Sequence, residues 1–131
     1  MYADLTNTGY QNLDANDSIV IVRHFDSIRG GRTLDVTNFT PEVIKAGHVI
    51  IQETATGNFK PMPLNGGATA YASLPTGHTY AGILIATILT KKPFASILVN
   101  GTVNPAAAPF DMSTILSAVK TALPLIAFRQ D

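Results

Sequence analysis

A chain of 131 residues, 46% hydrophobic and 14% charged, is long enough to bury one globular core without covalent cross-links. Its nine basic and nine acidic residues balance and cysteine is absent. This composition disfavours nucleic-acid binding, disulfide scaffolds, thiol catalysis and thiolate metal sites, and so low a charge favours self-association as a symmetric oligomer.

Residues 1–16 are expected to form a flexible N-terminal arm. Tyr2, Leu5, Tyr10 and Leu13 stand among polar residues without the period of a helix or a strand. Such a segment is typical either of a frayed terminus or of an arm that becomes ordered on a partner, with these four side chains as anchors. The segment lacks the basic residues and the apolar run of a signal peptide, so we expect the protein to be made in a cytosol.

Residues 17–131 are expected to form a single β-rich domain. Its first predicted strands are rich in β-branched residues and are bounded by turn residues: they lie at 17–23, 33–37, 48–54 and 59–62. Pro61 favours an edge position for the last of these, because proline cannot donate a hydrogen bond to a sheet. The sequence Thr-Pro-Glu that begins at Thr40 is typical of a helix start, and it predicts one short helix at 41–45.

Two apolar runs rich in Ile, Val, Leu and Thr occupy residues 80–90 and 94–104. Each is as long as a buried strand, and both fall short of the roughly 18 to 20 apolar residues of a membrane span. We predict two central antiparallel strands, joined by a tight turn at 91–93 and followed by a second turn at Asn100-Gly101. The side chains expected at the centre of the core are Ile85, Ile88, Ile97 and Val99.

The C-terminal part has the pattern of an amphipathic helix. Ile115, Val119 and Leu123 recur at helical spacing after Asp111, a favourable N-cap, and before Pro124, which ends the pattern. We predict a helix near 112–123 and a last short strand at 125–128. Together these elements predict a mostly β fold, either a small β-sandwich or a β-barrel, with two short helices.

Chemical motifs are sparse. His24, His48 and His78 are spaced too widely along the chain to form a local metal-binding motif. The order Asp26, His48, Ser73 permits a triad, but no Gly-x-Ser-x-Gly turn is present to expose a nucleophile. We therefore predict that the protein is not an enzyme and has no catalytic residue, metal or cofactor.

Four segments resemble the head decoration proteins of tailed phages, of the lambda-like kind, and the related head fibre proteins of phages and prophages of gut bacteria. The segments are Ile-Lys-Ala-Gly-His-Val-Ile-Ile at 44–51, Thr-Gly-Asn-Phe-Lys-Pro-Met at 56–62, Tyr-Ala-Gly-Ile-Leu at 80–84 and Ala-Ser-Ile-Leu-Val-Asn-Gly-Thr-Val at 95–103. The resemblance covers about residues 42–104. It concerns how a small β domain is built and includes no chemical site.

The resemblance implies a structural virion protein that sits as a trimer on the outer capsid surface, either as a decoration protein or as a head fibre or its base. Its partner would be the major capsid protein, on which the N-terminal arm becomes ordered. It would be made in the bacterial host cytoplasm, with neither nucleic acid nor membrane as a partner. The alternatives are a phage tail or fibre component, and a small ligand-binding β-barrel whose pocket is lined by Tyr71, Tyr80 and Phe94.

Overall fold

The computed structural model describes residues 17–67 and 69–129, which form one helical turn, ten strands, a 3-10 helix and a C-terminal α-helix. The helical segments are α1 (Asp17–Val20), η1 (Pro105–Ala107) and α2 (Leu116–Ala122). The strands are β1 (Ile21–Ser27), β2 (Arg32–Thr33), β3 (Val43–Ile44), β4 (Val49–Glu53), β5 (Phe59–Pro61), β6 (His78–Leu84), β7 (Ile88–Leu89), β8 (Phe94–Ala95), β9 (Ile97–Val103) and β10 (Ile126–Phe128). Neither α-helix has the length and hydrophobicity of a transmembrane helix.

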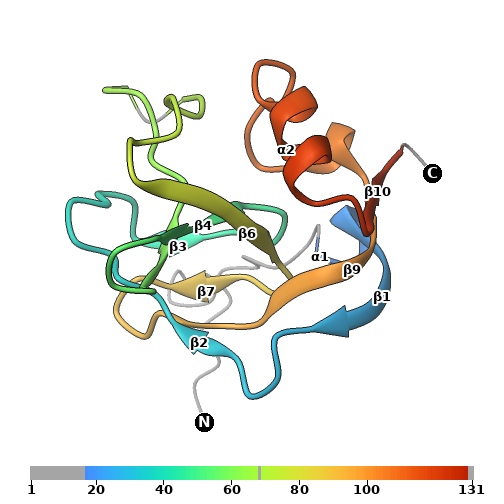
Figure 1. Ribbon diagram of the computed structural model, residues 1–131, viewed down its shortest axis with the longest axis horizontal. Helices are drawn as coiled ribbons and strands as arrows, with labels where there is room; N and C mark the ends of the chain where they lie inside the picture. The colour runs from blue at the N-terminus through green and yellow to red at the C-terminus, as the bar shows by residue number, and fades with distance from the viewer. Residues whose placement is uncertain (1–16, 68, 130–131) are drawn as a thin grey trace, which may run out of the picture.

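Six strands form the main sheet, in the order β1-β9-β6-β4-β5, with β10 added in parallel to β9. Two short antiparallel ribbons, β2–β8 and β3–β7, complete the set. Figure 1 shows β6 and β9 crossing the middle of the molecule, with α2 and β10 close together on one side. The prediction of a mostly β fold with a C-terminal helix is confirmed. Among the described strands the sheet does not close into a barrel, because β1 and β5 end it.

The two predicted central strands are neighbours in this sheet, but a tight turn does not join them. β6 and β9 pair only through Ile83 with Leu98 and Leu84 with Ile97. Residues 85–96 then leave the sheet and form β7 and β8, which pair with the distant β3 and β2. Pairing with distant segments thus replaces the predicted hairpin.

The predicted turn at Asn100-Gly101 is wrong, because both residues lie inside β9. Asn100 faces Asp26 and Gly101 faces His24 across the β1–β9 pairing. A Cβ atom at Gly101 would collide with the backbone oxygen of Arg23. The glycine is therefore needed for close approach of two strands, not for a turn.

The predicted helix at 41–45 is also wrong. Val43 and Ile44 form β3, and the backbone N–H of Thr90 donates to the Glu42 carbonyl at 2.9 Å beside it. Ile44 is fully buried, so pairing with β7 and burial override the local helix-start signature.

The strands predicted at 17–23 and 33–37 both differ from expectation. Residues 17–20 form α1, and the strand β1 starts only at Ile21. The Asp17 carboxylate accepts hydrogen bonds from the backbone N–H and hydroxyl of Thr87 at 2.8 and 2.6 Å. The strand predicted at 33–37 is reduced to β2, since a turn follows in which the Phe39 N–H donates to the Val36 carbonyl. The strands predicted at 48–54, 59–62 and 125–128 are confirmed as β4, β5 and β10.

The C-terminal helix is confirmed but begins later than predicted. The Asp111 carboxylate accepts from the backbone N–H and the hydroxyl of Ser113, which holds a turn instead of the helix start. The Met112 carbonyl then accepts from Ile115 and Leu116, and α2 begins at Leu116.

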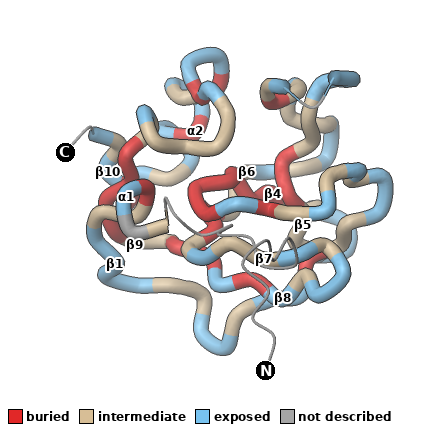
Figure 2. The backbone as a smooth tube through the Cα atoms, turned by 180° about the vertical axis from the view of Figure 1, so that it is seen from behind, coloured by how far each residue is buried: buried red, intermediate tan, exposed pale blue. Residues whose placement is uncertain are grey.

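The central strands β4, β6 and β9 are buried on both faces of the sheet, which explains the continuous apolar runs in the sequence. One cluster, which includes residues of α2 and β10, contains Val20, Val49, Ile51, Met62, Tyr71, Ile83, Leu98, Val103, Met112, Ile115, Val119 and Ile126. The second contains Leu34, Ile44, Ile50, Leu84, Ala95 and Ile97. Adjacent residues alternate between the clusters, as the two-residue period of a strand requires. Figure 2 shows buried residues gathered around β4 and β6.

Of the four predicted core residues, only Ile97 is fully buried. Ile85 and Ile88 are partly buried and pack at the margins of the two clusters, and Val99 is intermediate. The reason is the departure of the chain from the sheet after Leu84, which places both isoleucines outside the central strands.

Candidate functional site

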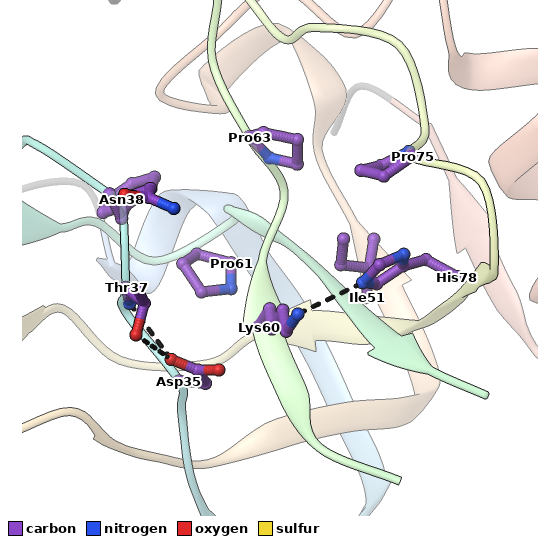
Figure 3. A pocket seen from close by; sticks show the side chains of 10 residues that line it. Asp35, Thr37, Asn38, Ile51, Lys60, Pro61, Pro63, Pro75 and His78 are labelled. Atoms are coloured by element: carbon purple, nitrogen blue, oxygen red, sulfur yellow. Dashed lines mark hydrogen bonds between the residues drawn. The ribbon is translucent and has the colours of Figure 1, made fainter. Parts of the chain in front are cut away.

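A pocket of about 180 Å³ lies on β5, between the loop at 35–39 and the start of β6 (Figure 3). Its titratable groups are Asp35, Lys60 and His78, and its apolar walls include Ile51 and Phe39. Pro61, Pro63 and Pro75 supply rigid surfaces around it. The pairing of β4 with both β5 and β6 brings Lys60 and His78 together from distant parts of the chain.

Lys60 is held by two partners at the edge of this pocket. Its Nζ lies 3.3 Å from a Glu53 carboxylate oxygen and 3.3 Å from Nε2 of His78. The Nδ1 atom of His78 lies 3.1 Å from the Thr76 carbonyl, which can only accept, so we assign the ring proton to Nδ1. Nε2 therefore accepts from Lys60. Hydrogen bonds from the Thr56 hydroxyl and from Lys60 lower the pKa of Glu53.

A tight turn positions Asp35 on the other side of the pocket. Asn38 has a positive φ of 66°, which asparagine tolerates better than most residues. The Thr37 hydroxyl and backbone N–H donate to one oxygen of Asp35 at 2.7 and 3.1 Å, and these bonds lower the pKa of the carboxyl group. Asp35 and Lys60 thus bring opposite charges to the lining of the pocket.

A larger open groove of about 560 Å³ adjoins the pocket at His78. One wall is the start of β6, with Thr79 and Tyr80, and the other is α2 with the turn before it. The residues on the α2 side are small or carry hydroxyl groups: Thr114, Ser117, Ala118, Thr121 and Ala122.

His48 is a structural histidine in the core. Its ring makes edge contacts with Phe39, Tyr71 and Phe110 at centroid distances of 5.5, 5.2 and 5.8 Å. Its Nε2 lies 3.0 Å from the Met62 carbonyl, so this nitrogen carries the proton. Burial lowers the pKa of His48 to about 4.

Asp26, His48 and Ser73, which were considered as a possible catalytic triad, do not form one. Within the part of the chain that the structure describes, no hydrogen bond joins His48 to either residue, since its Nε2 is committed to a backbone carbonyl. Asp26 is exposed on β1, where its carboxylate accepts from the Ser27 N–H. Nor do residues 17–67 and 69–129 contain any group of three or more His, Asp or Glu side chains that could hold a metal ion.

The three aromatic residues considered for a ligand pocket do not share one. Tyr71 is buried, and its hydroxyl accepts from the Val49 N–H at 3.1 Å. Burial raises the pKa of this hydroxyl. Tyr80 lines the groove, whereas Phe94 is exposed on β8.

Large apolar side chains are exposed in three places on the described surface. Ile19 in α1 and Phe25 in β1 are 51% and 65% exposed, and we call α1 together with β1 the N-terminal edge. Leu89 and Phe94 flank the exposed pair Lys91-Lys92, and Leu125 precedes β10. The predicted anchors Tyr2, Leu5, Tyr10 and Leu13 lie outside the described residues.

Sequence reasoning missed both the pocket and the groove. Asp35, Lys60 and His78 are separated along the chain, and no local motif marks them. The groove-facing side of α2 consists of small and hydroxyl residues, which form no sequence pattern that predicts a binding surface. Comparisons of the chain with protein-family models, with curated proteins and with solved structures find no match.

Proposed function

We propose that this protein is a structural virion protein that binds the outer surface of a tailed-phage capsid and stabilises it, as a decoration protein or as a head fibre or its base. The partner is the major capsid protein, and the protein acts as a trimer on the virion surface. The resemblance of residues 42–104 to head decoration and head fibre proteins supplies the class of partner.

The observation that carries the proposal is the exposed apolar surface of the N-terminal edge. Ile19 and Phe25 are more than half exposed on a chain with only 14% charged residues. Among the described strands, β1 pairs on one side only, with β9. Exposed apolar side chains on an otherwise well-packed domain are typical of a protein interaction surface.

The opposite end of the sheet supports this assignment by contrast. At β5, Pro61 removes a backbone donor, and the Asp35 N–H donates to the Phe59 carbonyl at 2.8 Å. Lys60 and Glu53 add a charged pair beside it. These features protect β5 from pairing with other chains, which leaves the N-terminal edge as the more suitable attachment surface.

The N-terminal arm is the second part of the proposed attachment. Residues 1–16 directly precede α1, so the anchors Tyr2, Leu5, Tyr10 and Leu13 belong to the same end of the chain as Ile19 and Phe25. When the arm becomes ordered on the capsid, the loss of conformational entropy costs about 1 kcal/mol or more of free energy per residue. Matching apolar pockets on the capsid would offset that loss.

Co-sedimentation with undecorated phage heads tests the proposal. We expect the full chain to saturate the heads and a variant without residues 2–16 to melt normally but to lose binding. A full chain that fails to bind heads, or binds isolated tails instead, would overturn the proposal in favour of another class. If the shortened chain still saturates the heads, the arm is not the attachment segment.

Light scattering tests the oligomeric state separately. We expect a mass of three chains of 13.9 kDa each, either free in solution or on release from heads. A monomer mass in both conditions would contradict the trimer.

A further inference from the structure

We infer that the groove between β6 and α2 receives an extended, uncharged peptide segment of the capsid protein, which pairs with β6 as an additional strand. This inference rests on the proposed function and identifies a second attachment point, distinct from the N-terminal edge. Three features of the groove lead to it: a free strand edge, an uncharged lining and small side chains on the facing helix.

The first feature is a gap in the main sheet. On one side, β4 pairs with β6 at residues 78–80 and again at 82–83, with a register shift between them at Ala81. On the other side β9 pairs only with Ile83 and Leu84, and β10 pairs with β9 further along, at Gly101 to Val103. Among the described residues, no strand pairs with this second edge of β6 at residues 79–81.

The free edge is next to the groove. Thr79 and Tyr80, which belong to the unpaired stretch, line it. Thr79 and Tyr80 are in continuous register with β4. Successive residues of a strand direct their backbone groups to alternate sides, so one of these two presents its N–H and C=O groups away from β4. A partner strand provides the hydrogen bonds that water otherwise supplies, and this is a common mode of peptide recognition.

The second feature is the absence of Asp, Glu, Lys and Arg from the groove lining. The one titratable imidazole there, His78, is held between the Thr76 carbonyl and Lys60. A charged residue of the ligand would lose hydration without gaining a partner of opposite charge. The chemistry therefore favours an uncharged segment.

The third feature is the composition of the helix wall. Ser117, Ala118, Thr121 and Ala122 follow helical spacing and turn small side chains towards the groove. Small side chains leave room for a backbone to approach, and their hydroxyl groups can bond to it. The volume of about 560 Å³ is sufficient for a few residues of extended chain.

A pair of tryptophan substitutions on α2 tests the inference. Ala118 and Lys120 are both exposed on this helix, but only Ala118 lines the groove. We expect Ala118→Trp to fill the groove and to weaken binding to undecorated heads by about tenfold or more, whereas Lys120→Trp binds like the parent. Both variants should melt like the parent.

Hydrogen exchange of the unaltered chain gives a second measurement that does not depend on any variant. At least one backbone amide among residues 79–81 should exchange rapidly in the free protein and become protected on heads. If the parent binds heads but Ala118→Trp binds equally well, or these amides keep their exchange rates, the groove is not an attachment point. If the parent protein itself does not bind heads, that result contradicts the proposed function and, with it, this inference.

Discussion

β9 and β1 are neighbours in one sheet, yet the apolar side chains of β9 are buried and a large one of β1 is exposed. β9 buries Ile97 and Leu98 completely, whereas β1 leaves Phe25 65% exposed. The difference follows from position: β9 has strands on both sides and lies between two apolar clusters, while β1 ends the sheet. Hydrophobic sequence alone therefore does not decide burial, and the exposed residues of β1 are available for a partner.

The largest expected effect is at the centre of β9. Ile97→Ala should lower the free energy of unfolding by about 2 to 5 kcal/mol, because it leaves a cavity in a fully packed cluster. Phe25→Ala, which removes a larger but exposed side chain, should change it by about 0.5 kcal/mol or less. Urea unfolding of both variants measures the contrast, and equal losses would show that β1 is buried as deeply as β9.

Acid should lower the free energy of unfolding, because His48 is buried in the core as a neutral ring. Its folded pKa of about 4 lies below the ordinary value of 6.5, so the unfolded chain binds a proton that the folded chain excludes. The His48 contribution to stability should be nearly constant above pH 6.5 and should fall by about 3 kcal/mol as the pH drops from 6.5 to 4. In His48→Gln, which keeps a donor for the Met62 carbonyl, this dependence should disappear. Parallel pH profiles of the two proteins in urea unfolding would contradict the assignment.

Close contact between β9 and β1 predicts a smaller loss at Gly101. Gly101→Ala places a methyl group against the Arg23 backbone and should cost about 1 to 3 kcal/mol. Gly66→Ala is the matched control, since nothing lies within 4 Å of the added atom. Similar melting temperatures for the two variants would mean that β1 moves away from β9 at little cost.

The parts of the fold that depend on local pattern could be predicted from the sequence. The apolar run of β4, the prolines around β5 and the helical spacing in α2 specify their elements over a few residues. Pairing between segments that are far apart in the sequence determined the remaining elements. Val43 and Ile44 became a strand because β7 lies beside them, and Gly101 lies in β9 because β1 approaches it.

The pocket could not be predicted for the same physical reason. Lys60 and His78 are 18 residues apart and meet only because β4 pairs with both of their strands. Asp35 joins them through the turn at Asn38. The free edge of β6 depends on where β9 stops pairing, which has no signature in the sequence of β6.

Comparing head binding of two exposed phenylalanines tests most directly whether the N-terminal edge attaches the protein to the capsid. Phe25 and Phe94 are 65% and 60% exposed, but only Phe25 belongs to that edge. Phe25→Ser and Phe94→Ser should melt like the parent. In co-sedimentation with undecorated heads, Phe25→Ser should bind about tenfold more weakly and Phe94→Ser as tightly as the parent. Full binding by Phe25→Ser, or an equal loss in both variants, would contradict attachment through the N-terminal edge.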